Sequence, residues 1–223
     1  MKLLALDTST EYLSLCLWQD GAALSRDILA GQTHSQRVLP MAGEMLAEAG
    51  LSLAQLDGIA FGAGPGSFTG LRIACGVAQG LAFGANLPVA GVSTLLALAQ
   101  QSNESRVIAC LDARMGEVYH AAYERAGSAW RPVCEPGLYR PEGVPAVNGD
   151  GWIGTGSGWD AHGAALQARY AGQIGGVVQN AFPHARDIAA LAAVEFAAGR
   201  GVTAAAAAPV YIRNKVAFAM AER

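Results

Sequence analysis

The residue run Gly62-Ala-Gly-Pro-Gly-Ser-Phe-Thr-Gly-Leu-Arg72 carries the strongest chemical signal in this chain. It joins a short apolar run to a long small-residue stretch, which predicts a strand, a glycine turn and a helix. The N–H groups at the start of a helix attract anions, and glycines allow close backbone approach. The run lacks the Lys-Ser/Thr ending of a P-loop, which favours a packing turn over a phosphate cradle. This structural loop comprises Gly64, Pro65, Gly66, Ser67, Thr69 and Gly70.

A second candidate anion site follows the first predicted strand, where Asp7, Thr8 and Ser9 come directly after an apolar run. An acid at this position can hold metal-bound phosphate while neighbouring amides and hydroxyls surround it. In the alternative interpretation, Asp7 ends a strand and its carboxylate satisfies the amides of a turn. These three residues are the candidate nucleotide contacts.

Other patterns that carry chemistry are absent from the sequence. No two of its four histidines have the spacing of a metal-binding pair such as H-x-x-x-H. Ser67 lies in G-P-G-S-F, which is not the G-x-S-x-G pattern of a nucleophile elbow. The carboxylates form no compact pair suited to acid–base catalysis. We therefore assign no catalytic residue and no metal site.

Two predicted helices offer surface for a partner. Methionines lie along the helix expected at residues 35–48, and such side chains adapt to a partner's surface. The helix expected at residues 67–84 has glycines at four-residue spacing, so another backbone can approach it, from its own lobe or from another molecule. Arg72, near the start of that helix, could face an anion or a partner's acid. The candidate interface residues are Val38, Met41, Met45, Ile73, Gly76, Val77, Gly80 and Gly84.

The order of predicted elements indicates an α/β protein with two lobes. Residues 1–102 read as βββαβαβα, and residues 103–208 repeat this order in a degenerate form, each half opening with a strand that ends in Asp. We expect residues 209–223 to pack on the first lobe. We interpret residues 131–150, which contain four prolines, as irregular linking structure, and we expect a final helix at about residues 184–198.

Composition restricts the class of protein further. Hydrophobic residues make up 52% of the 223 residues and charged residues 15%, which predicts a sizeable core. The net charge of −3 is a poor basis for independent binding of nucleic acid. The four cysteines show no C-x-x-C spacing, and no segment is typical of a signal peptide or membrane span. The expected location is the cytoplasm.

Five motifs, in this order along the chain, resemble those of the bacterial TsaB family, whose members take part in tRNA threonylcarbamoyladenosine biosynthesis. They are Leu4-Ala-Leu-Asp-Thr-Ser-Thr10, His34-Ser35 with Leu39-Pro40, Gly64-Pro-Gly-Ser-Phe-Thr-Gly-Leu-Arg72, Leu111-Asp-Ala-Arg114 and Pro209-Val-Tyr-Ile-Arg213. The resemblance implies two actin-like (ASKHA) lobes with a degraded nucleotide site. It also implies a tRNA-modification role, in which threonylcarbamoyl is added to the adenosine beside the anticodon of ANN-reading tRNAs.

The resemblance further implies that the subunit is non-catalytic. The catalytic paralogue would be TsaD, which carries the metal-binding histidine pair, and the ATPase TsaE would join the complex. Contact with TsaD, or with a second copy as a homodimer when TsaD is absent, would use the first two long helices. No cofactor would be intrinsic, ATP or ADP would bind at the interface of the complex, and tRNA would be reached only through the complex. Two alternatives stay open: an autonomous actin-like ATP-dependent phosphotransferase and a glycoprotease-like hydrolase.

Overall fold

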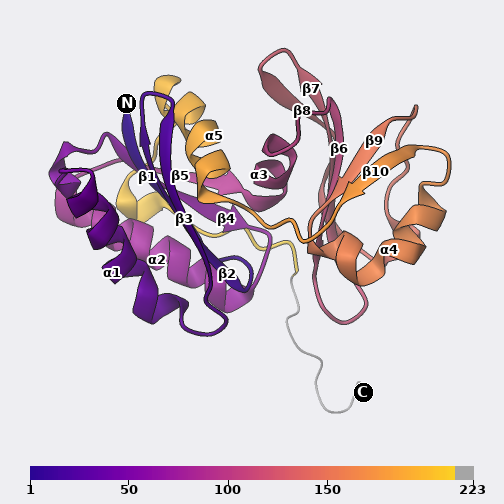
Figure 1. Ribbon diagram of the computed structural model, residues 1–223, viewed down its shortest axis with the longest axis horizontal. Helices are drawn as coiled ribbons and strands as arrows, with labels where there is room; N and C mark the ends of the chain where they lie inside the picture. Colours follow the sequence, from indigo (N-terminus) through magenta and orange to yellow (C-terminus); the bar gives the residue numbers. More distant parts are fainter. Residues whose placement is uncertain (214–223) are drawn as a thin grey trace.

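The computed structural model describes residues 1–213, in which two five-stranded mixed sheets lie side by side (Figure 1). The first sheet has the order β3-β2-β1-β4-β5 and the second the order β8-β7-β6-β9-β10, so the two lobes repeat one topology. The first half contains β1 (Lys2–Asp7), β2 (Tyr12–Gln19), β3 (Ala22–Leu29), α1 (His34–Glu48), η1 (Leu53–Gln55), β4 (Gly58–Gly64), α2 (Phe68–Ala85), β5 (Val89–Ser93) and α3 (Thr94–Gln100). The second contains β6 (Arg106–Asp112), β7 (Val118–Ala126), β8 (Ala129–Tyr139), η2 (Pro141–Gly143), β9 (Trp152–Thr155), α4 (Ser157–Arg169), β10 (Ile174–Val178), α5 (Ala185–Ala197) and η3 (Ala204–Ala206).

The first sheet is covered on both faces because its strands alternate. Leu4 and Leu6 of β1 pack into the core beneath α1 and α2, whereas Leu3 and Ala5 pack into a second core beneath α5. Helices α1 and α2 lie on one face and α5 on the other (Figure 1). Helix α3 packs against β6 and β7 and joins the two lobes. The predicted α/β class and duplicated lobes are confirmed.

The second sheet contains two strands that the sequence did not reveal. The prediction of irregular structure at residues 131–150 is wrong in part, because β8 runs antiparallel to β7 as far as Tyr139. Pro132 and Pro136 are compatible with this strand because β8 is at the edge of the sheet, where missing N–H groups break no ladder. Strand β10 forms the opposite edge and pairs in parallel with β9. Its two glycines weaken the strand pattern.

The predicted division at residue 208 is wrong for the final helix. The predicted helix is present as α5, but its buried face packs against β1 and β2 of the first lobe. After α5, Val202 pairs with Val89 of β5, and Ala207 enters the core beneath α2. Residues 185–208 therefore belong to the first lobe. An amphipathic pattern shows that a helix has a buried face but does not say which sheet it covers.

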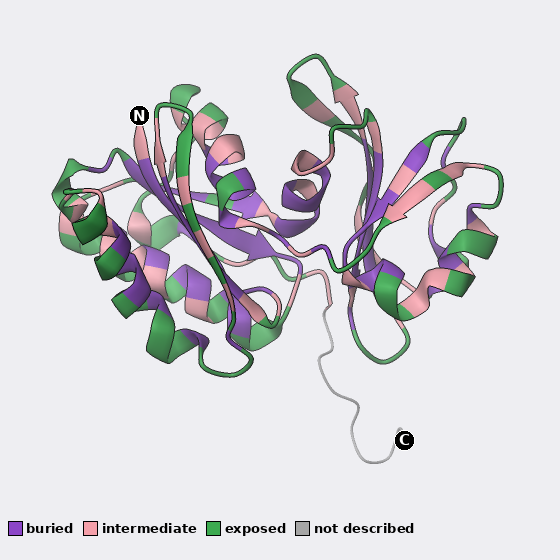
Figure 2. Cartoon of the chain, viewed as in Figure 1, coloured by how far each residue is buried: buried purple, intermediate pink, exposed green. Residues whose placement is uncertain are grey.

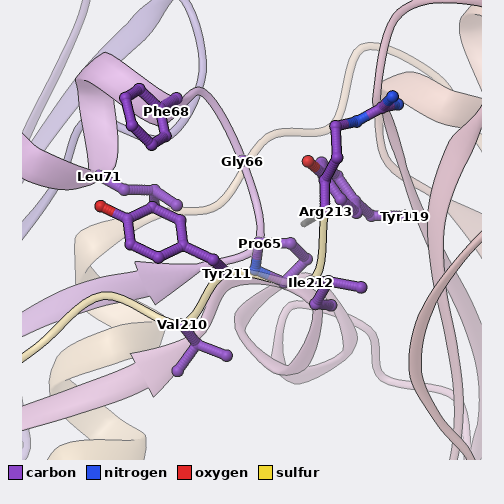
Figure 3. Close-up of a pocket in the computed structure, with 9 residues that line it drawn as sticks. All are labelled: Pro65, Gly66, Phe68, Leu71, Tyr119, Val210, Tyr211, Ile212 and Arg213. Carbon is purple, nitrogen blue, oxygen red and sulfur yellow. The ribbon is translucent and has the colours of Figure 1, made fainter. Parts of the chain in front are cut away.

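Residues 209–213, which we call the strap, run between the lobes. The N–H of Val210 donates to the Ala63 carbonyl of β4 at 2.7 Å, so the strap begins on the first lobe as predicted. Its end reaches the second lobe, where Arg213 donates to the Ala113 carbonyl at 3.1 Å and pairs with Glu117 at 2.7 Å. In Figure 3, Tyr211 and Arg213 point to opposite sides of this segment. The prediction for residues 214–223 lies outside the described residues.

Candidate functional site

A cleft of about 1150 Å³ lies between the two lobes. The loop after β1 and the start of α2 line it from the first lobe, and the loop after β6 and the start of α4 line it from the second. The polar lining residues include Thr8, Ser9, Ser67, Thr69, Asp112, Arg114, Ser157, Asp160 and Arg213. The topology thus places the strand-ending loops of both repeats at one cavity.

Asp7 does not line this cleft. Its side chain is buried, and Oδ1 accepts bonds from the Ser9 N–H at 2.9 Å and the Ser9 hydroxyl at 2.7 Å. Oδ2 has no hydrogen-bond partner among the described residues. It lies over the backbone of Gly62, since a Cβ atom built there would be 1.8 Å from Oδ2. These contacts match the interpretation in which Asp7 ends a strand and its carboxylate accepts hydrogen bonds from the turn that follows.

Burial dominates the electrostatics of Asp7. Loss of solvent raises the pKa of its carboxyl from 3.8 to about 6, although the two bonds from Ser9 favour the ionised form. A metal-bound phosphate in the cleft would need a carboxylate that reaches it. The Asp7 side chain is instead buried against the backbone of Gly62 inside the lobe, so it does not fit the role of a metal-phosphate ligand.

The loop comprising residues 64–70 packs on the turn after β1. The Ser67 N–H donates to the Ser9 carbonyl at 2.8 Å, and the Thr8 hydroxyl donates to the Gly70 carbonyl at 2.7 Å. A Cβ atom at Gly70 would lie 1.9 Å from the Thr8 carbonyl oxygen, and one at Gly66 would lie 2.7 Å from Ser9 Cβ. These glycines permit close contact between the two loops. The packing-turn interpretation thus describes the loop, and Ser67 caps α2 by accepting from the Gly70 N–H at 3.3 Å.

The acid of the second lobe occupies a different environment. Asp112 Oδ1 accepts from the Arg114 N–H at 3.0 Å, and its carboxylate lies 3.5 Å from the His162 ring. The Ser157 hydroxyl accepts from the Asp112 N–H at 3.1 Å. Asp112, Arg114 and Arg213 reach the cleft although they were not among the predicted site residues. The signal that could have found Asp112 is the repeated strand that ends in an acid.

The structure divides the predicted interface residues into two groups. The assignment of Val38, Met41 and Met45 is wrong, because these side chains are buried beneath α1 in the protein's own core. Apolar spacing on a surface helix marks the face turned toward the sheet, so it could not identify a face for a partner.

In residues 1–213, no group of three or more His, Cys, Asp or Glu side chains could hold a metal ion.

The interface residues on α2 are arranged differently. Gly76, Gly80 and Gly84 are exposed, and Ile73 and Val77 beside them are half-buried. A Cβ atom added at any of the three glycines would meet nothing within 4 Å, so no part of the described chain packs against them. Packing within the same lobe therefore does not explain their spacing. Exposed residues continue along the outer sides of α1 and α2 in Figure 2. We call Ile73, Gly76, Val77, Gly80 and Gly84 the α2 face.

Comparison with known proteins identifies the family. A protein of Escherichia coli K12 named tRNA threonylcarbamoyladenosine biosynthesis protein TsaB is 41% identical, with 98% of this chain and 97% of that protein covered. The chain belongs to the TsaB family. A protein of Haemophilus influenzae with the same name is 39% identical over 98% of this chain and 96% of its own length. The sequence model of the family described as "TsaD: tRNA N6-adenosine threonylcarbamoyltransferase" matches residues 28–217 of this TsaB-family chain.

A solved structure supports the fold as well as the family. The structure described as YeaZ from Pseudomonas aeruginosa is 43% identical, with a TM-score of 0.86 over 94% of this chain and 99% of that one. The resemblance to the TsaB family stated from the motifs is confirmed, and this TsaB-family chain shares its duplicated two-sheet fold with the YeaZ structure. None of its described helices is both long and apolar enough to span a bilayer.

Proposed function

We propose that this chain is a non-catalytic subunit in tRNA threonylcarbamoyladenosine formation that docks on the catalytic paralogue TsaD. Its relatives in E. coli and H. influenzae are named as biosynthesis proteins of this modification, which supports the pathway. The proposed role is that of a scaffold and activator, with the ATPase TsaE joining the complex. Transfer of threonylcarbamoyl to the tRNA adenosine is assigned to TsaD.

The observation that carries this proposal is the open α2 face. Three exposed glycines four residues apart leave the α2 backbone uncovered by any described residue, beside the half-buried Ile73 and Val77. Without side chains between them, a partner's helix can approach the α2 backbone closely and gain dispersion contacts along its length. The closed turn around Asp7 supports a subunit without its own phosphoryl-transfer chemistry. Any ATP or ADP would then be held at the seam of the complex.

Substitution of the central glycine tests the docking. Gly80→Leu adds a bulky side chain to this exposed face, and because a Cβ atom at Gly80 would meet nothing within 4 Å, the isolated protein should stay folded. We expect Gly80→Leu to abolish co-purification with TsaD and the gain in tRNA modification on mixing. Gly163→Leu is the matched control, because Gly163 is also a helical glycine with open space around it, but on α4 of the second lobe. Unchanged co-purification of Gly80→Leu would refute docking through the α2 face.

The phosphotransferase alternative makes a different prediction. It requires the isolated chain to bind Mg-ATP tightly and to lose that binding in Asp7→Ala. Because Asp7 is directed into the lobe, we expect titration calorimetry of the wild type and this variant to give the same weak or absent heat.

Homodimer formation in the absence of TsaD would use the same α2 face, and Gly80→Leu should therefore also yield a monomer by mass measurement.

A further inference from the structure

Near the start of α2, the cationic side chain of Arg72 contacts two aromatic residues. The Cζ atom of Arg72 lies 3.8 Å from the centre of the Phe68 ring, and the Arg72 Nε–H donates to the Tyr211 hydroxyl at 3.0 Å. The two rings lie 5.3 Å apart, although Tyr211 comes from the strap. In Figure 3 the Tyr211 ring lies beside Leu71 with Phe68 above it. Residues far apart in the chain thus hold one guanidinium group in place.

The outer part of this guanidinium is available to a ligand. Arg72 is exposed, and within residues 1–213 its two terminal nitrogens make no hydrogen bond or ion pair. Stacking on Phe68 and the bond through Nε fix the plane of the group without using its terminal N–H donors. A planar, fixed arginine fork matches the two oxygens of a carboxylate. Its rotational freedom is already restricted before any partner binds, which lowers the entropy cost of binding.

The position of Arg72 relates this fork to the α2 face. Residues four apart lie on one side of a helix, and Arg72 precedes Gly76 by one such step. We propose that Arg72 binds a carboxylate side chain of TsaD and fixes the register of its helix along the α2 face. This inference rests on the proposed docking. A protein carboxylate is preferred over an RNA phosphate because the chain, with a net charge of −3, lacks the basic surface that nucleic acids need, and because Arg72 is next to the uncovered backbone of the α2 face.

Binding measurements with purified TsaD test the role of the fork. We expect Arg72→Gln to raise the Kd of the heterodimer roughly 30-fold or more, as removal of an arginine hot spot does. Arg72→Lys keeps the charge but loses the paired geometry, so it should recover only part of the affinity. Tyr211→Phe keeps the ring and loses the bond to Nε, and its effect should be smaller than that of Arg72→Gln. The matched control is Arg131→Gln, which removes an exposed arginine from β8 of the second lobe.

A rescue experiment identifies the partner group. Arg72→Glu should prevent binding to wild-type TsaD and regain it with one TsaD variant in which a single acid is replaced by arginine. The inference is wrong if Arg72→Gln binds TsaD like the wild type while Gly80→Leu does not, and docking itself then stands. It is also wrong if Arg72→Gln leaves the heterodimer Kd unchanged but weakens tRNA binding by the complex, because the fork would then bind phosphate. If both Arg72→Gln and Gly80→Leu bind TsaD like the wild type, the proposed docking through the α2 face is wrong together with the role of Arg72.

Discussion

Replacement of Asp7 by asparagine should stabilise this protein at neutral pH. The substitution keeps the size of the side chain and its Oδ1, which can still accept both bonds from Ser9. It removes the negative charge that the wild type must bury next to Gly62. At a residue that binds metal or phosphate, loss of the charge would be expected to impair function. Here we expect a gain in stability with normal docking on TsaD.

The size of the effect follows from the pKa of Asp7. Burial raises this pKa from 3.8 to about 6, so the folded state binds a proton more tightly than the unfolded state does. One pKa unit corresponds to 1.36 kcal/mol, and the difference therefore amounts to about 3 kcal/mol as an upper figure. An acid with a raised pKa favours the folded state at low pH. Its contribution is lost as pH rises through the interval from about 4 to 6.

Urea unfolding of both proteins at several pH values between 4.5 and 8 measures this directly. Contributions of other titrating groups cancel in the difference between the two free energies of unfolding. We expect the stability advantage of Asp7→Asn to grow with pH up to about 6 and to reach up to about 3 kcal/mol above it. A difference that stays constant with pH, or a variant less stable than the wild type at pH 8, would refute the account of Asp7 as a buried, unfavourable charge.

Three further substitutions test other contacts. Gly62→Ala would place a methyl group 1.8 Å from Asp7 Oδ2, so we expect thermal unfolding to show a loss of about 2 kcal/mol or more; normal stability would contradict this packing. Tyr170→Phe removes the hydroxyl that bonds a buried histidine at 2.8 Å and a carbonyl at 2.7 Å, and urea unfolding should show a loss of about 1–3 kcal/mol. Arg213→Met releases the strap from the second lobe, so limited proteolysis should cut near residue 213 faster than in the wild type; equal rates would show that these contacts do not hold the strap.

Sequence patterns predicted the elements of the first lobe because they are local. The alternation in β2, the glycine after α1 and the serine before α2 each indicate structure within a few residues. The same local rules failed for β8, since prolines that exclude a central strand are tolerated at an edge. Whether a segment is at an edge is decided by the pairing of the whole sheet. No local pattern contains that information.

The candidate site depended even more on tertiary structure. The sequence placed Asp7 at the end of a strand but did not say whether its carboxylate would face the cleft or Gly62. It also marked Met41 and Met45 as adaptable surface, although the spacing that made them conspicuous is what buries them against the sheet. The sequence also singled out the glycines of α2 but left their own lobe as a possible packing partner, and only the structure shows that a Cβ atom at these positions would meet nothing within 4 Å. The contact between Arg72 and Tyr211 joins residues 139 positions apart.

The return of α5 to the first sheet has a consequence for synthesis of the chain on the ribosome. The core formed by β1, β2 and α5 remains incomplete until residues 185–197 have been made, after most of the second lobe. Ala207, which fills the other face of the first sheet, is translated later still. The first lobe is therefore not expected to reach its final stability as a nascent chain. A truncated gene that encodes only residues 1–102 should yield a product that aggregates or is degraded rather than an independent unit.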